Sequence, residues 1–213
     1  MGNPTSNPES IGSKSTPVTS GTPHAEVGCH GATKPRHIWL VAGPAGCGKT
    51  TVAKYLSTTL ELPYVEGDLY HPEANIKKMS DGIPLTDADR WDWLTLLREE
   101  SVKKLASGVD GVVVTCSALK RKYRDVIRVA PYFSRGIVVH FIYLQASEAM
   151  LLARVSSRQG HYMGANMVRS QFEILEPPMA EETDVISIDV SGSITEVCEE
   201  VLRQAKATIN KAV

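Results

Sequence analysis

The chain has 213 residues, which suits one domain with a small insertion, and its 42% hydrophobic residues are enough to form a core. A formal net charge of −1 and the lack of any apolar run near the roughly 18–20 residues of a membrane span argue against nucleic-acid and membrane partners. Four cysteines far apart in the sequence argue against a zinc site or a disulfide framework and favour a reducing compartment.

Residues 1–36 differ in composition from the rest of the chain. They are rich in Ser, Thr, Pro and Gly and have no periodic apolar face. Such a segment cannot bury enough surface to offset the entropy lost on ordering, so we expect a disordered tail. It lacks the apolar region of a secretion signal, and Glu9 and Glu26 balance its few basic residues, which argues against a transit peptide. A variable extension and a regulatory, phosphorylatable tail are both consistent with this composition.

From residue 37 to residue 213, apolar strands alternate with helical segments. Strands are expected at residues 37–43, 63–68, 111–118, 136–144 and 184–190. Helices are expected at residues 49–61, 87–108, 120–130 and 147–158, then after a glycine-bearing break at 159–166, and at the C-terminus. This alternation predicts a three-layer α/β fold, in which a parallel sheet of about five strands carries helices on both faces.

The segment GPAGCGKT lies between the first strand and the first helix and matches the pattern G-x-x-x-x-G-K-[ST]. Glycines let backbone N–H groups converge on phosphate oxygens at the helix N-terminus, where the helix dipole favours an anion. Lys49 can reach the β- and γ-phosphates, and the Thr50 hydroxyl can bind Mg²⁺. We therefore predict a P-loop NTPase fold that uses ATP and Mg²⁺. The residues expected to bind the phosphates of ATP are Gly43, Pro44, Ala45, Gly46, Cys47, Gly48, Lys49, Thr50 and Thr51.

Cys47 within this loop has two interpretations. It can be an inert small residue that fills a loop position, which we favour. Alternatively, Lys49 and the helix N-terminus could lower the pKa of its thiol and make it a redox switch.

Other features of the sequence favour a small-molecule kinase among P-loop proteins. No guanine-reading N-K-x-D motif follows a strand, and the strand at 111–118 lacks the terminal Asp that motor or transporter ATPases use for Mg²⁺. The second strand instead ends in Glu66-Gly67-Asp68, beside the loop at the carboxyl edge of the sheet. Asp68 can orient an acceptor hydroxyl and accept its proton, and Glu66 can serve Mg²⁺ directly or through water. Both could also be carboxylates of a plain turn around Gly67.

Two further motifs resemble the gluconokinase family, the ATP-dependent kinases of D-gluconate. The motifs are GDxxHPxxNxxKMxxGxPLxDxDR, which starts at Gly67, and CSALKxxYRD, which starts at Cys116. Residues 154–178 are similar to the family's lid and the helix after it. The resemblance covers the chain from residue 37 onward. It implies the nucleoside-monophosphate-kinase type of P-loop fold with a small helical lid, and a cytoplasmic homodimer that phosphorylates gluconate.

Gluconate is a carboxylate that bears a row of hydroxyls, so its recognition needs cations together with hydrogen-bonding groups. The residues expected to bind it are Asp68, His71, Asn75, Lys78, Arg90, Lys120 and Arg124. His71-Pro72 could instead cap a helix, Lys78 could face solvent, and Lys120 with Arg124, one turn apart, could form a solvated basic face.

Arg154 and Arg158 are expected to bind the phosphates from the lid, with Arg158 joining Lys49 and Asp68 in catalysis. The other interpretation makes both of them surface arginines at a helix C-terminus.

The chain departs from the family pattern at three places. Glu66 stands where the family usually has Asp, and Gln159 replaces a lid lysine. The usual Arg-x-Pro-Trp-Leu appears here as the segment RWDWL at residues 90–94, without the proline. Alternative functions are phosphotransfer to shikimate, to a nucleoside monophosphate or to another small hydroxylated acceptor, and nucleotide-binding regulation without catalysis.

Overall fold

The computed structural model describes Gly2, residues 34–157 and residues 164–211. The disorder expected for residues 1–36 therefore lies almost wholly outside the described residues, as do Arg158 and Gln159. The first strand begins at Arg36, and Lys34 pairs with Asp110 at 2.7 Å. The folded domain thus starts slightly before residue 37.

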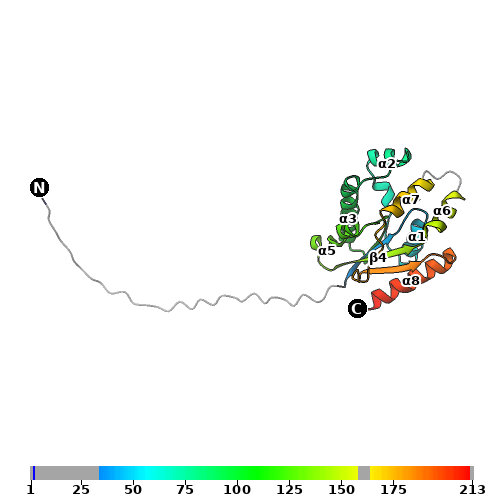
Figure 1. The fold of residues 1–213 in the computed structure, drawn as a ribbon. Coiled ribbons are helices and arrows are strands. Elements are labelled where there is room, and N and C mark those ends of the chain that lie inside the picture. Colours follow the sequence, from blue (N-terminus) through cyan, green and yellow to red (C-terminus); the bar gives the residue numbers. More distant parts are fainter. Residues whose placement is uncertain (1, 3–33, 158–163, 212–213) are drawn as a thin grey trace. The chain divides into compact units, whose positions relative to one another are not determined.

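Five parallel strands form one sheet in the order β2–β3–β1–β4–β5, as the alternating pattern predicted. Figure 1 shows the sheet, with β4 labelled, among the helices. The strands are β1 (Arg36–Ala42), β2 (Tyr64–Val65), β3 (Gly111–Thr115), β4 (Ile137–Gln145) and β5 (Val185–Asp189). Neighbouring strands cover both edges of β1, and helices cover both of its faces. Every residue of β1 after Arg36 is buried as a result, which explains why this strand is a nearly continuous apolar run.

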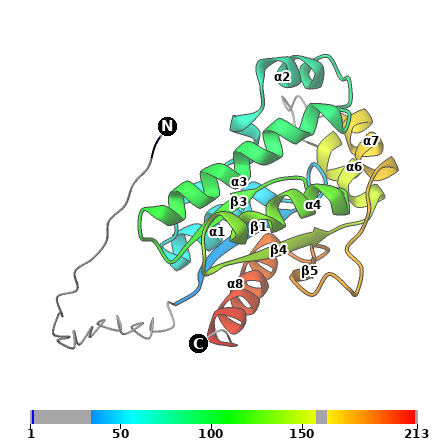
Figure 2. The ribbon, with the colours of Figure 1, turned by 90° about the vertical axis from the view of Figure 1, so that its left-hand side faces the viewer.

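Helices pack on both faces of the sheet (Figure 2). They are α1 (Lys49–Leu60), α2 (Glu73–Ser80), α3 (Trp91–Ala106), α4 (Arg121–Arg128), α5 (Ala130–Phe133), α6 (Glu148–Ser156), α7 (Ala165–Glu173) and α8 (Ile194–Lys211), with 3-10 turns η1 (Gly67–Tyr70) and η2 (Ala88–Arg90). Ile38 packs in the core beneath α3 and α4, whereas Trp39 packs in the core beneath α1 and α8. Successive residues of β1 therefore supply the two cores in turn.

Helix boundaries differ from the sequence prediction at three places. The polar stretch after Asp68 contains a helix, α2, which the sequence analysis did not predict. This helix buries only Asn75 and Met79, so its sequence has no apolar periodicity. The expected helix at 120–130 divides into α4 and the short α5. Lys120 is the extended residue that precedes α4, so it does not share a helical face with Arg124.

The strand order of the sheet reverses at β1. From β1 the chain runs outward to β2 and β3, and later crosses β1 to add β4 and β5 on the other side. Ligands of open α/β sheets bind at the carboxyl ends of strands where the order reverses. That position lies at the end of β1, where the glycine-rich loop begins.

Candidate functional site

The glycine-rich loop joins β1 to α1. Gly43, Gly46 and Gly48 have φ angles of +138°, +84° and +101°, which are strained for any other residue. This backbone path lets α1 begin at Lys49, and the first N–H groups of a helix have no partner within the helix. An anion held there meets both free donors and the positive end of the helix dipole.

A cavity of about 190 Å³ opens above the loop. Its walls come from the loop, from α1, from the turn after β2, from α3 and from the region of α6 and α7. Its lining residues are Ala45, Gly46, Gly48, Lys49, Thr50, Thr51, Asp68, His71, Met79, Leu85, Arg90, Trp93, Ser117, Val155, Met167 and Gln171. The structure thus brings together most of the residues predicted for the phosphates, with the predicted base Asp68 and two predicted acceptor-binding residues.

Lys49 and Asp68 supply the opposite charges of this cavity. The Lys49 ammonium donates to the carbonyl oxygens of Gly43 and Pro44, both at 3.0 Å, so it folds back over the loop. Asp68 is accessible from the open cavity, yet the surrounding walls desolvate its carboxyl and raise its pKa above 3.8, with Lys49 opposing the shift and Glu66 adding to it. A carboxyl with a raised pKa accepts a proton more readily than a fully solvated one.

Glu66 is held by two hydroxyl groups. Tyr64 and Thr115 both donate to its carboxylate, and burial followed by the bond to Glu66 raises the pKa of the Tyr64 phenol. Thr50, at the start of α1, lines the cavity. A hydroxyl and a carboxylate are hard oxygen donors of the kind that Mg²⁺ uses together with substrate phosphates, rather than a complete protein cage. Thr50 and Glu66 are therefore donors of a type that fits Mg²⁺, with Thr50 on the cavity wall and Glu66 outside the lining residues.

Arg90 is a buried cation in this cavity, with 6% of its surface exposed. Its Nη1 donates to the carbonyl oxygens of Leu85 and, at 3.0 Å, of Thr86, and its guanidinium lies 5.4 Å from the centre of the Tyr123 ring. Within residues 34–157 and 164–211, no carboxylate pairs with it. Burying an arginine without an acidic partner is costly, so this position is suited to an anionic ligand.

His71 lines the same cavity and stacks on Trp93, with ring centres 4.0 Å apart and an angle of 17° between the planes. Burial and, to a smaller extent, Arg90 lower the pKa of His71 to about 4. Its buried Nδ1 has no hydrogen-bond partner in the described part of the chain. No side chain caps α2, whose N-cap is Pro72, so a capping role for His71 is not supported.

Asn75 and Lys78 do not line the cavity. The Asn75 amide donates to the Asp89 carbonyl at 2.6 Å, and Lys78 pairs with the Asp89 carboxylate, also at 2.6 Å. Asp89 also accepts from the backbone and hydroxyl of Thr86. In this structure both residues tie α2 to the turn before α3.

Lys120 and Arg124 likewise point to protein partners. Lys120 pairs with Asp87 at 3.0 Å. Arg124 is 1% exposed and forms a two-pronged ion pair with Glu182, at 2.7 and 2.6 Å, while donating to the Ala118 carbonyl at 3.1 Å. Of the lysines and arginines predicted to bind gluconate, namely Lys78, Arg90, Lys120 and Arg124, Arg90 is thus the one that lines the cavity.

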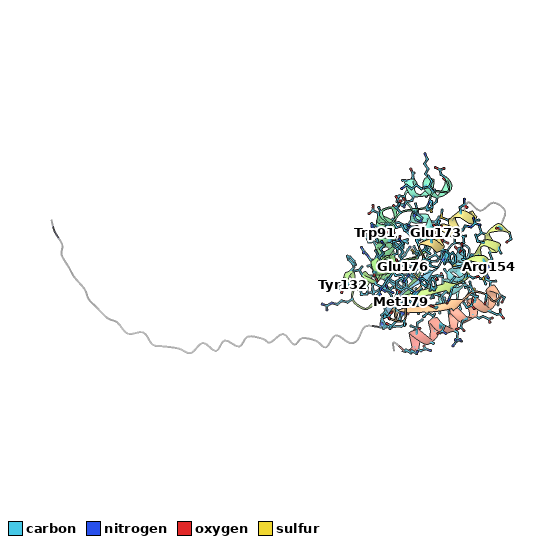
Figure 3. The ribbon with its side chains drawn as sticks, in the orientation of Figure 1. Trp91, Tyr132, Arg154, Glu173, Glu176 and Met179 are labelled. Carbon is cyan, nitrogen blue, oxygen red and sulfur yellow. The ribbon has the colours of Figure 1, made fainter. Side chains whose placement is uncertain are left out.

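A second cavity of about 450 Å³ shares Gly46, Gly48 and Thr51 with the first. Its other walls come from the end of α6 and from the turn between β5 and α8, namely Cys47, Arg154, Ser157, Val190, Gly192, Ile194 and Val197. Arg154 donates to the Val190 carbonyl at 2.7 Å. Figure 3 shows Arg154 on the side of α6 and α8, away from Trp91. Arg158 lies outside the described residues.

Cys47 is 1% exposed, and burial raises the pKa of its thiol above 9.0 despite the nearby Lys49. A protonated, buried thiol is a poor nucleophile, which favours the inert interpretation over a redox switch.

Two residues of the site were not predicted to be functional, although both lie in segments that resemble the family, Trp93 in RWDWL and Gln171 in residues 154–178. Gln171 on α7 is 7% exposed, and its side-chain oxygen accepts the Ala45 N–H at 2.7 Å, which fixes the loop from above. Trp93 on α3 donates its indole N–H to the Gly67 carbonyl at 2.8 Å. Both act on residues distant in the chain, 126 and 26 positions away, so local patterns could not reveal them.

Comparison with known proteins gives consistent matches. A model of the shikimate kinase family matches residues 45–206. A probable gluconokinase of Schizosaccharomyces pombe is 47% identical over 177 residues, which cover 83% of this chain and 91% of the relative. The gluconokinase of Gluconobacter oxydans is 40% identical and is covered over 93% of its length, with 82% of this chain.

Solved structures agree with these sequence matches. A gluconokinase from Sinorhizobium meliloti superposes with a TM-score of 0.72 at 37% identity, covering 84% of this chain and 95% of its own. A shikimate kinase from Acinetobacter baumannii superposes with a TM-score of 0.51 at 19% identity, over 83% of this chain and 95% of its own, so that likeness concerns the fold.

Proposed function

The chain belongs to the gluconokinase family of P-loop kinases, and on this premise we propose that it transfers the γ-phosphoryl group of ATP to the 6-hydroxyl of D-gluconate. The products are 6-phospho-D-gluconate and ADP. D-Gluconate presents one carboxylate and several hydroxyls, and the cavity above the loop offers charged and polar groups of matching chemistry.

The proposal rests mainly on one observation, the burial of Arg90 in the cavity without a carboxylate partner among the described residues. The guanidinium of Arg90 is buried in the same cavity as Lys49 and Asp68, and no carboxylate within the described ranges neutralises it. An acceptor that bears its own carboxylate supplies the missing anion, whereas a neutral sugar leaves the cation unpaired. This favours a sugar acid over a sugar as the acceptor.

The remaining roles are assigned from the chemistry of the residues. The N-terminus of α1 and Lys49 bind the β- and γ-phosphates, and Asp68 orients the acceptor hydroxyl and takes its proton. Mg²⁺ would be held by Thr50 and, through water, by Glu66, and it supplies charge neutralisation on the phosphates. Arg158 is proposed to add positive charge from the lid.

The second cavity is proposed to hold the nucleoside part of ATP. It joins the loop at Gly46 and Gly48, and it combines the Arg154 guanidinium with the aliphatic walls of Val190 and Ile194. A guanidinium plane and apolar side chains suit the two faces of a purine ring. ATP would then extend from this cavity across the loop to the acceptor.

An ADP-release assay with a panel of acceptors tests the function. We expect turnover with D-gluconate and little with glucose, shikimate or nucleoside monophosphates. In Arg90→Gln the KM for gluconate should rise at least tenfold while the KM for ATP stays unchanged, because the lost charge faces the acceptor. Lys120→Met is the matched control, since Lys120 pairs with Asp87, and its kinetics should stay near those of the wild type. Equal kcat/KM for glucose and gluconate would contradict the sugar-acid proposal.

We further propose that the enzyme works as a cytoplasmic homodimer, as the family resemblance implies. Cys47, Cys116 and Cys198 are buried and free, which suits a reducing compartment. Sedimentation equilibrium measures the subunit number, and a monomer at micromolar concentration would contradict the dimer.

A further inference from the structure

The turn η1 (Gly67–Tyr70) carries the proposed base, and within it Tyr70 packs against the core whereas the two residues before Tyr70 are exposed. Asp68 is exposed to the cavity, and Leu69 is 81% exposed. A short 3-10 turn with exposed side chains is not held in place by burial of those side chains. The position of Asp68 within the turn therefore depends on Tyr70 and on the residues that hold the two ends of the turn, Gly67 and His71.

Trp93 contacts both of these ends. Its indole N–H donates to the Gly67 carbonyl at 2.8 Å, immediately before Asp68. Its ring stacks on His71, the residue that follows the turn, at 4.0 Å between centres. Trp93 is 2% exposed in the core between α3 and the sheet, so it is itself rigidly held.

Strand β3 fixes the same turn from the opposite side. The Gly67 N–H donates to the Thr115 hydroxyl at 3.0 Å. A Cβ atom on Gly67 would lie 2.0 Å from the Thr115 carbonyl oxygen and 3.3 Å from the Leu97 side chain, so only glycine fits between β3 and α3. The backbone just before Asp68 is thus clamped by one side chain from β3 and one from α3.

From these contacts we propose that Trp93 is a positioning residue, which holds Asp68 and His71 at a fixed separation so that both engage one acceptor molecule. This inference rests on the proposed phosphorylation of gluconate and deepens it. Asp68 meets the reacting hydroxyl, and the imidazole of His71 meets another polar group of the same acceptor. Misplacement of a reacting group by about 1 Å can lower the rate up to ~100-fold. Contact of the rigid Trp93 ring with both ends of the turn would keep Asp68 and His71 aligned with the acceptor.

Trp93→Phe tests the proposal, because it keeps a ring to stack on His71 and removes the donor to Gly67. We expect kcat with gluconate to fall between about 10- and 100-fold, with the KM for ATP unchanged. The matched control is Trp91→Phe, two residues earlier on α3 and 38% exposed, which should keep wild-type kinetics. Unchanged kcat in Trp93→Phe would overturn the proposal.

A double-mutant cycle separates positioning from general loss of structure. If Trp93 acts through Asp68, Trp93→Phe should lower the residual kcat of Asp68→Asn less than twofold. A full additive loss would overturn the proposal, because it would show that Trp93 acts independently of the base.

A fluorescence measurement keeps the proposal testable if Trp93→Phe fails to fold. Trp91→Phe retains only Trp39 and Trp93, and Trp39 packs in the core on the other face of the sheet. Gluconate binding should change the emission of this variant through the imidazole stacked on Trp93, and His71→Ala should abolish the change. Gluconate binding without any change in emission would contradict contact through His71.

The two proposals fail in different ways. If wild-type enzyme does not phosphorylate gluconate, the proposed function is wrong. The Trp93 variants are then assayed with the acceptor that the panel identifies. If wild-type enzyme is active and Trp93→Phe is equally active, the function holds and the positioning role is wrong.

Discussion

Arg90 and Arg124 are two buried arginines, with 6% and 1% of their surfaces exposed, and their surroundings give them different tasks. Arg124 meets Glu182, which has 1% of its side chain exposed, and the Arg124 ion pair holds the pKa of Glu182 at about 2. Arg90 has no carboxylate partner among the described residues and lines the cavity. A paired arginine stabilises the fold, whereas an unpaired one in a cavity is available to a ligand.

Arg124→Ala is therefore expected to affect stability rather than acceptor recognition. Removing one partner of a buried ion pair costs about 3–5 kcal/mol, which corresponds to a fall in Tm of roughly 10 °C for a domain of this size. Thermal unfolding measures the loss, and the KM for gluconate at low temperature should be unchanged. The double variant Arg124→Met with Glu182→Leu should recover most of the Tm. A large rise in the KM for gluconate without a change in Tm would show that Arg124 binds the acceptor.

Asp68→Asn is expected to lower kcat by about 10²- to 10⁴-fold, because the amide keeps the shape of the carboxylate but cannot accept the proton. ATP binding, measured by calorimetry, should survive. In the wild type, kcat/KM should fall as the pH drops through the raised pKa of Asp68, since the protonated carboxyl is no longer a base. If the Asn variant keeps wild-type kcat, the base lies elsewhere.

At the scale of elements, β1 and β4 bury a pair of histidines far from the cavity. His37 and His140 are hydrogen-bonded at 3.0 Å, and Trp39 stacks on both. One ring nitrogen must donate and the other accept, so the pair is stable with both rings neutral. Burial and then His37 lower the pKa of His140 to about 4, while burial and then Lys34 lower that of His37; Asp184 and Asp110 oppose these shifts.

This pair predicts an acid-sensitive stability. Below about pH 6.5 the unfolded chain binds protons at these histidines, whereas in the folded state His140 stays neutral until the pH nears 4 and the pKa of His37 is also lowered, so stability present at neutral pH is lost as the pH falls. A shift of this size at His140 corresponds to roughly 3 kcal/mol by pH 4. The Tm should fall between pH 7 and pH 5, and it should fall less in His140→Asn. An equal fall in the variant would assign the effect to other groups, such as His71.

At the scale of the whole molecule, the candidate site lies at the end of the central strand of one compact unit, which the structure describes from Lys34 onward. Within the described residues, no helix is long and apolar enough to cross a membrane. The net charge of −1 leaves no general attraction for anions, so the proposed binding of phosphate and gluconate depends on local arrangements at the loop and at Arg90.

Deleting residues 1–33 tests whether the tail contributes to this unit. We expect the truncated enzyme to keep its Tm and its kinetics, because the tail has no apolar periodicity with which to pack on the domain. Lys34 is retained, since it pairs with Asp110. A fall in Tm of several degrees would show that the tail packs on the domain.

Local patterns in the sequence were sufficient for the sheet and the phosphate loop. Apolar runs at residues 37–43 and 136–144 predicted the central strands, because a parallel strand covered on both faces tolerates few polar residues. The motif from Gly43 to Thr50 predicted the loop, because only glycine adopts its positive φ angles without strain. The strands and the loop depend on residues that are adjacent in the sequence, so the sequence alone predicts them.

Only the tertiary structure decided which polar residues line the cavity. Lys78, Lys120 and Arg124 have the same chemistry as Arg90, but each meets a carboxylate at Asp89, Asp87 or Glu182 that lies 11 to 58 positions away. Trp93 and Gln171 reach the site for the same reason, through partners distant in the chain. An ionic or hydrogen-bonding side chain is free or satisfied according to what folding brings beside it, so sequence predicts the kind of site and folding selects its members.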